Sequence, residues 1–164
     1  MANSYPRDAA EHELLHSMIK ANRDAVLWKL EGITDEQAKQ RVVASDTTLL
    51  GIVRHLQYVD RWWVRIVIDG GDIPVPWSRD DPDADWRVTD DDTIDQVVAD
   101  YQAELELVDA IIDGIEDLSA TVTARDRTFA LRWILMHLVE ETARHAGHAD
   151  IIREVIDGEV GYVR

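Results

Sequence analysis

The chain has 164 residues, a length that suits a single domain able to bury a sizeable core. It carries 33 acidic and 17 basic residues, and the resulting net charge of −16 would repel a phosphate backbone, so we expect no nucleic-acid partner. The chain contains no cysteine, which excludes disulfides and cysteine ligands to a metal.

The start of the sequence and its apolar stretches predict where the protein resides. Residues 1–16 show no basic start followed by an apolar run, so we expect no signal peptide. Charges interrupt the apolar stretches within a few residues, as at Arg61 and Arg65, so we expect no membrane-spanning helix. Together these features predict a cytoplasmic protein.

Four segments space their apolar residues three and four positions apart, which predicts helices. They run from about Asp8 to Glu31, from Thr47 or Thr48 to Ile68, from Thr93 to Leu118 and from Thr128 to Ile156. No segment shows the alternation of a strand. The sequence therefore predicts an all-α four-helix bundle that spans residues 1–164 as one domain.

The first predicted helix contains the pattern His12-Glu13-x-x-His16, which matches the zinc-binding motif of metalloproteases. The motif lies in the first turns of the helix, where helices fray. No later segment supplies the strands and the third ligand that such proteases use. We therefore do not interpret this motif as a zinc site.

The second predicted helix contains one histidine, His55, in an apolar stretch. Its neighbours Ile52, Leu56 and Val59 indicate that the imidazole points inward. An inward histidine is either a hydrogen-bonded core residue or a metal ligand, and its own surroundings leave both interpretations open.

Residues 70–92 form one long crossover loop with three prolines and two tryptophans, Trp77 and Trp86. Loops of this length in compact domains are usually functional or mobile. The two tryptophans are candidates for the wall of a ligand pocket, although core packing or a dimer contact would explain them equally well.

The same loop contains Asp81, Asp83 and Asp85, whose spacing resembles the start of a calcium-binding loop. Trp86 stands where that loop requires glycine. We interpret the three aspartates as a solvated acidic loop.

The fourth predicted helix carries His137, Glu141, His145 and His148 at three- and four-residue intervals, within about 80° of one another around the helix. A polar stripe on an otherwise apolar helix is costly unless something satisfies it, and a metal ion would do so. Glu141 and His145 would join His55 in a set of two imidazoles and one carboxylate, which in catalytic zinc sites leaves a coordination position open.

Other interpretations of this stripe remain. Glu141 could lie on a solvated face or pair with Arg144. His137 and His148 are better explained as groups beside the site, which orient ligands or move a proton, than as ligands themselves.

Three segments carry a resemblance to a known family: TLLGIVRHLQYVDRWW (48–63), DPDADW (81–86) and LRWILMHLVEETARHAGHADIIREVIDG (131–158). They resemble the actinobacterial mini-circle proteins of the DinB-like superfamily. That family is similar to the mycothiol-dependent maleylpyruvate isomerases and to the bacillithiol and mycothiol S-transferases.

The resemblance implies a four-helix bundle, often a homodimer, with a three-ligand metal site at one end. The family's helix-two histidine corresponds to His55, and its last-helix ligand pair corresponds to Glu141 and His145. Many relatives have histidine at both places of that pair, whereas this chain has glutamate at the first, as in the isomerase branch. The expected divalent metal is zinc, with nickel as the alternative.

By this analogy, we expect a metal-dependent transferase that activates a low-molecular-weight thiol, mycothiol, for attack on an electrophilic small molecule. His137 and His148 are the candidate catalytic histidines, and Trp77, Trp86 and Arg144 the candidate residues of the thiol pocket. One alternative is a metal-binding stress-response or hydrolase-type protein without thiol chemistry. Another is a purely structural bundle that dimerises.

Overall fold

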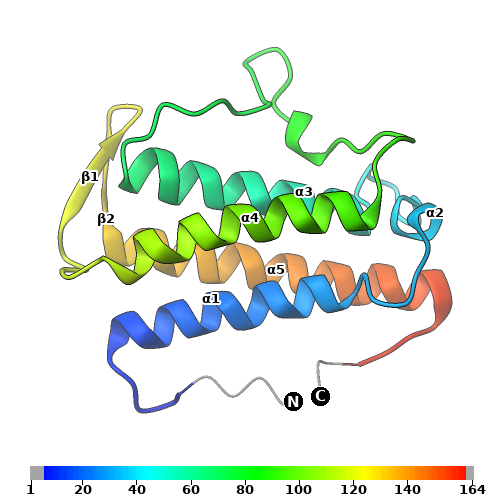
Figure 1. Ribbon diagram of the computed structural model, residues 1–164, viewed down its shortest axis with the longest axis horizontal. Helices are drawn as coiled ribbons and strands as arrows, with labels where there is room; N and C mark the ends of the chain where they lie inside the picture. Colours follow the sequence, from blue (N-terminus) through cyan, green and yellow to red (C-terminus); the bar gives the residue numbers. More distant parts are fainter. Residues whose placement is uncertain (1–5, 162–164) are drawn as a thin grey trace.

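The computed structural model describes residues 6–161 of the chain (Figure 1). Long helical segments lie side by side. The helix α1 (Glu11–Trp28) packs along α5 (Leu131–Asp157), and α3 (Leu49–Asp60) packs along α4 (Ile94–Asp113) and also contacts α5. The predicted helical bundle is confirmed. The π-helix η1 (Arg61–Ile68) directly continues α3.

Apolar side chains at helical spacing fill the interior of the bundle. One buried cluster includes Leu50, Ile52, Leu56 and Ile152, and the other includes Val64, Ile112, Ile134 and Leu138. Burying one such side chain contributes about 1.5–3 kcal/mol relative to leaving it in water. Each cluster contains residues of α5 and of α3 or its continuation η1, so the clusters pack these helices against each other.

A threonine N-cap begins α3 and another begins α4. The Oγ1 atom of Thr48 accepts a hydrogen bond from the Gly51 backbone N–H at 3.0 Å, and that of Thr93 accepts one from Gln96 at 3.3 Å. Threonine satisfies an otherwise unpaired helix N–H in this way. The predicted starts of the second and third helices are therefore confirmed.

The connection between α4 and α5 contains a feature that the sequence analysis missed. Residues Thr121–Ala124 (β1) and Arg127–Ala130 (β2) form an antiparallel hairpin in which Val122 lies opposite Phe129. The predicted extension of the third helix to Leu118 and the predicted start of the fourth at Thr128 are wrong. Gly114 caps α4 soon after its last turn, and the β-branched run from Thr121 favours a strand.

The first predicted helix is also too long by about one turn at each end, because α1 runs from Glu11 to Trp28. A short helix, α2 (Asp35–Ala38), follows it and is closed by a capping box at Thr34. None of the helices among the described residues combines the length and the apolarity of a membrane span.

The crossover loop lies along the outside of α3 (Figure 1) and contains a short 3₁₀ turn, η2 (Ala84–Trp86). Gly51 permits this approach, because a Cβ atom there would lie 2.8 Å from the carbonyl oxygen of Trp86. The backbone of the loop thus approaches the backbone of the helix one turn before His55.

Candidate metal centre

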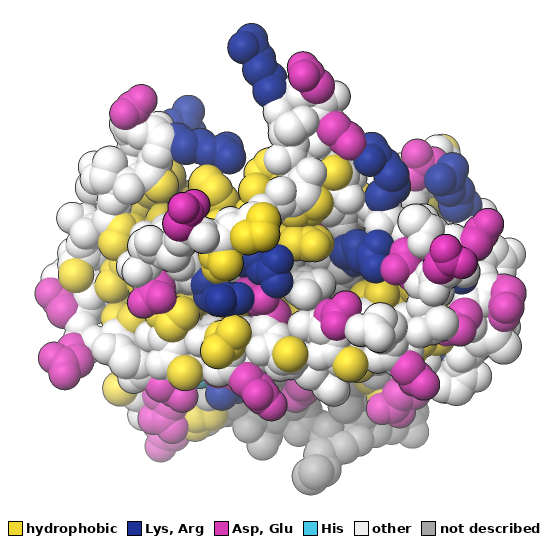
Figure 2. Space-filling model, turned by 45° about the horizontal axis from the view of Figure 1, so that its top comes forward, with side chains coloured by type: hydrophobic (Ala, Val, Ile, Leu, Met, Phe, Trp, Pro, Cys, Tyr) yellow, Lys and Arg dark blue, Asp and Glu magenta, His cyan; other side chains and the backbone are white. Residues whose placement is uncertain are grey.

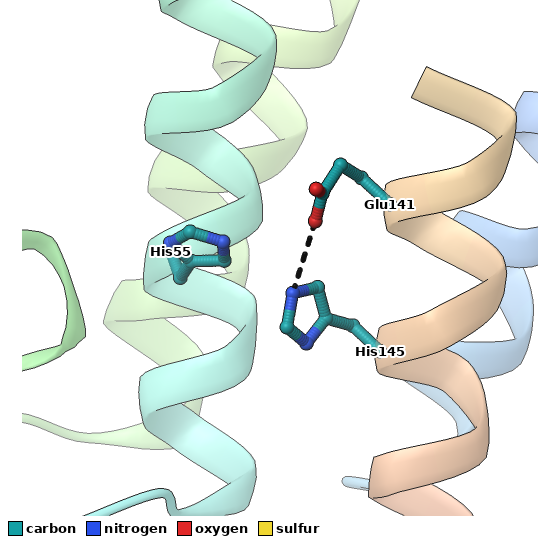
Figure 3. A group of neighbouring side chains, drawn as sticks. All are labelled: His55, Glu141 and His145. Atoms are coloured by element: carbon teal, nitrogen blue, oxygen red, sulfur yellow. Dashed lines mark ion pairs between the residues drawn. The ribbon is translucent and has the colours of Figure 1, made fainter. Parts of the chain in front are cut away.

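The three residues that the sequence proposes as ligands lie together between two helices. His55 projects from α3, and Glu141 and His145 project from successive turns of α5 (Figure 3). One ligand atom from each lies within 4.8 Å of the other two. Within residues 6–161, this is the one trio of histidine or carboxylate side chains close enough to share an ion.

Glu141 and His145 already face one another. The Nε2 atom of His145 lies 3.3 Å from Oε2 of Glu141, the contact that is dashed in Figure 3. The spacing of four residues on one helix produces this arrangement, because it stacks the two side chains along one face. Both therefore point at the same volume, opposite His55.

The other face of His55 is held by the crossover loop. Its Nδ1 atom lies 2.6 Å from Oδ2 of Asp85, and its ring stacks on Trp86 with 3.9 Å between centroids. This contact suits a tautomer of the neutral imidazole in which Nδ1 donates to the carboxylate and Nε2 keeps the lone pair that a metal ligand needs. Histidine ligands in metal sites are commonly oriented by such a carboxylate.

Asp85 corrects the interpretation of the acidic loop. It is buried, with only 5% of its surface exposed, so it is not part of a solvated acidic run, whereas Asp83 is exposed. The sequence analysis missed its role. The segment DPDADW was available as a signal, because histidine ligands are commonly oriented by a carboxylate and this segment carries the family resemblance.

His145 is neutral at physiological pH. Burial is the main cause, assisted by the nearby charges of two histidines and an arginine, and lowers the pKa of His145 to about 4. A neutral imidazole keeps the lone pair that a cation requires. The Nδ1 atom of His145 faces the exposed His148, whose own Nδ1 lies 3.4 Å away.

His137 lies one turn before Glu141 and lines the same pocket. Its ring stacks on Trp133 at 5.0 Å and meets the edge of Trp63 at 5.2 Å, while its Nε2 lies 4.0 Å from Oε1 of Glu141. The imidazole is therefore oriented by aromatic contacts and directed beside the trio. A catalytic role for His137 or His148 stays a prediction.

Arg144 lies at the edge of the pocket and pairs with two glutamates. Its guanidinium is 3.0 Å from Glu140 and 3.2 Å from Glu141. The sequence analysis had named the pairing of Glu141 with Arg144 as an alternative to a metal-ligand role for Glu141. Because it engages Oε1 of Glu141, it leaves Oε2 directed toward His145.

A hollow of about 450 Å³ surrounds the trio. Trp86 and Thr47 line it together with the five candidate residues of α5, so Trp86 lies where the sequence analysis expected a pocket wall. Trp77 does not line this hollow. It packs against Tyr58 and Trp62 and lines a neighbouring one.

The protease-like motif at the start of α1 has structural partners instead. His12 bonds the carbonyl of Ile112 at 2.7 Å, and His16 contacts Asp109 at 3.0 Å and Asp113 at 2.9 Å. Both histidines join α1 to α4, in agreement with our decision not to interpret the motif as a zinc site.

Two imidazole nitrogens and one carboxylate oxygen suit a divalent cation of zinc type and leave it a net positive charge. The donors come from two helices only and one side of the trio faces the hollow, so coordination positions remain for a water or a substrate atom. The residues present therefore fit the expected metal.

Comparison with known proteins identifies a family for the chain. A family model described as mycothiol S-transferase matches residues 14–158, which includes all three residues of the trio. A comparison with curated proteins finds no match.

Proposed function

This chain belongs to the mycothiol S-transferase family, and on that premise we propose that it joins the sulfur of mycothiol to an electrophilic small molecule. A divalent cation held by His55, Glu141 and His145 would activate the thiol. We propose zinc as the cation, with nickel as the alternative. A homodimer and a cytoplasmic location remain predictions.

The observation that carries this proposal is the convergence of three ligand atoms within 4.8 Å in a chain that has no cysteine. Because the chain has no cysteine, a nucleophilic sulfur must come from a bound thiol. A divalent cation in this position would remove the proton of a coordinating thiol and so supply the nucleophilic thiolate.

The chain's own residues position and polarise the site. The Asp85 carboxylate holds His55 with Nε2 toward the trio, and Arg144 orients Glu141. In the overall transfer, the S–H proton is lost, an S–C bond forms, and the bond to the leaving group breaks with its electron pair. His137 and His148 line the hollow and are the proposed acceptors of that proton.

Neighbouring glutamates on α5 provide a matched test. Glu141→Gln removes a proposed ligand charge, whereas Glu140→Gln removes the same charge from an exposed residue one position earlier. We expect Glu141→Gln to lose bound zinc, measured by elemental analysis after dialysis, and to lose conjugation of mycothiol by at least about 100-fold. Glu140→Gln should keep both.

The outcomes separate the alternatives. Equal zinc content in both variants would contradict the proposed site. Zinc binding without conjugation of mycothiol to any of a panel of electrophiles would instead support a metal-binding or hydrolase-type protein.

A further inference from the structure

A second hollow, of about 700 Å³, adjoins the candidate metal centre. His55, Val59 and Trp63 line both hollows, so the two share a wall at the trio. Beyond this wall the second hollow extends between η1 and the crossover loop, as far as the β1–β2 hairpin. We call it the aromatic pocket.

The walls of the aromatic pocket are apolar and planar. Trp62 and Trp77 meet edge to face with 6.0 Å between ring centroids, and Val75 and Pro82 of the loop add further apolar lining. The one carboxylate among the described residues of the lining, that of Asp85, lies on the side shared with the trio and is engaged by His55. Apolar side chains gather on this face between the hairpin at upper left and the loop at the top of Figure 2. Such walls favour a flat, largely apolar ligand.

Two arginines lie on the rim of the pocket, Arg79 from the loop and Arg125 from the hairpin turn. Other arginines of this region, such as Arg54 and Arg87, form ion pairs with aspartates. Among residues 6–161, neither Arg79 nor Arg125 has an acidic partner. In a chain of net charge −16, two unpaired guanidinium groups at one hollow would attract an anion to it.

The hairpin turn holds Arg125 in place at a conformational cost. Arg125 and Asp126 have φ angles of +48° and +61°, a left-handed pair that favours asparagine and glycine. The turn nevertheless carries an arginine, whose guanidinium carbon lies 4.4 Å from the Trp62 ring centroid. Stacking on tryptophan orients the cation over the pocket without neutralising it.

We propose that the aromatic pocket binds the electrophile, and that its ligands are flat aromatic molecules that carry a carboxylate or a similar anionic group. The aromatic body would lie between Trp62 and Trp77, and the anion would meet Arg79 and Arg125. The pocket's role in the reaction rests on the proposed function, whereas its selectivity for aromatic anions can be measured without catalysis.

Binding is tested with 3,5-dinitrobenzoate, an aromatic anion without a leaving group, and with its neutral methyl ester. Isothermal titration calorimetry would compare the chain with the double variant Arg79→Ala/Arg125→Ala. We expect the variant to bind the acid at least about fivefold more weakly and the ester within about twofold of the unaltered chain. Arg79→Lys/Arg125→Lys should restore much of the loss.

The double variant Arg41→Ala/Arg132→Ala is the control for net charge, because both residues are exposed, are paired elsewhere and do not line the pocket. It should bind acid and ester as the unaltered chain does. Equal losses of acid binding in the two double variants would overturn the proposal, and so would equal losses of acid and ester in the pocket variant.

Catalysis is tested with 4-chloro-3,5-dinitrobenzoate and its methyl ester as electrophiles for mycothiol. We expect the pocket variant to raise KM for the acid about fivefold or more, with kcat and the ester's KM within about twofold. Selective binding without conjugation would support the pocket and contradict the proposed function. Conjugation in which the pocket variant keeps the same KM for the acid would support the proposed function and contradict the proposed pocket.

Discussion

Both ring nitrogens of His55 are directed by the residues around it. Asp85 engages Nδ1 at 2.6 Å, Trp86 covers one face of the ring, and Nε2 is left toward Glu141 and His145. A ligand that is oriented before the cation arrives loses less conformational freedom on binding. The pocket therefore has a preferred geometry before any ion is bound.

The Asp85 contact can be tested against a close neighbour. Asp85→Asn should keep the side-chain volume but weaken the orientation of His55, and should lower zinc affinity about 10- to 100-fold, measured by competition with a chromogenic chelator. Asp83→Asn alters an exposed aspartate of the same loop and should leave the affinity unchanged. Equal affinities in the two variants would show that the carboxylate does not support the ligand.

Among the residues of the site, the sequence predicted the trio but not the Asp85 carboxylate that holds His55. Glu141 and His145 are four residues apart on one helix, so local periodicity places them together. His55 followed from its inward position and from the family resemblance. Asp85 could not be separated from its neighbours in the loop, because nothing local tells which aspartate of an irregular segment turns inward.

At the scale of the elements, the contact of η2 with α3 positions the candidate site. The loop approaches the helix at Gly51, where the Trp86 carbonyl would lie 2.8 Å from an added Cβ. That close approach sets Asp85 and Trp86 over His55. The π-helix η1 then turns Trp62 and Trp63 toward the hollows beside the trio, in keeping with the frequent occurrence of π-helical turns at functional sites.

Two glycine substitutions test this arrangement. Gly51→Ala should force η2 away and lower the free energy of unfolding by about 1–3 kcal/mol, with weaker zinc binding as well. Gly147→Ala, on an open stretch of α5, should raise the free energy of unfolding by up to about 1 kcal/mol. Urea unfolding measures both. A Gly51→Ala protein as stable as Gly147→Ala would contradict the close approach.

The helices were predictable because their apolar residues repeat over several turns and threonines cap two of their starts. The β1–β2 hairpin was not. Its strands have four residues each, too few for alternation to stand out, and its turn uses Arg125 and Asp126 in place of the asparagine and glycine that usually mark such turns.

Across the whole molecule, a charged cluster inside the bundle joins three helices. Arg23 of α1 lies 2.6 Å from Asp60 of α3 and 2.8 Å from Asp109 of α4, and the Tyr101 hydroxyl donates to Asp60 at 3.0 Å. Breaking one member of a buried pair leaves the other uncompensated, so the cluster makes bundle stability depend on pH.

Asp109 contributes a loss of stability in acid. Burial alone would raise the pKa of Asp109, but the hydrogen bond from His16 and the charge of Arg23 outweigh it and lower this pKa from 3.8 to about 2. The folded state thus binds the proton less tightly than the unfolded state. The stabilisation, about 2 kcal/mol, is present above about pH 4 and is lost as pH falls toward 2.

Substitution of Asp109 should therefore flatten the acid limb of the stability profile. Asp109→Asn is expected to be less stable than the unaltered chain at pH 7 and to lose less stability between pH 4 and pH 2, measured by urea unfolding at each pH. Parallel profiles for the two proteins would show that another group causes the acid sensitivity.

In the proposed reaction, His55, Glu141 and His145 hold one cation that also binds the sulfur of mycothiol. Zinc K-edge X-ray absorption of the zinc-loaded protein, before and after mycothiol is added, would detect this coordination. We expect two imidazoles and only nitrogen or oxygen neighbours at first, then one sulfur at about 2.3 Å. A zinc environment without sulfur at saturating mycothiol, or an identical spectrum in His55→Ala, would contradict the claim.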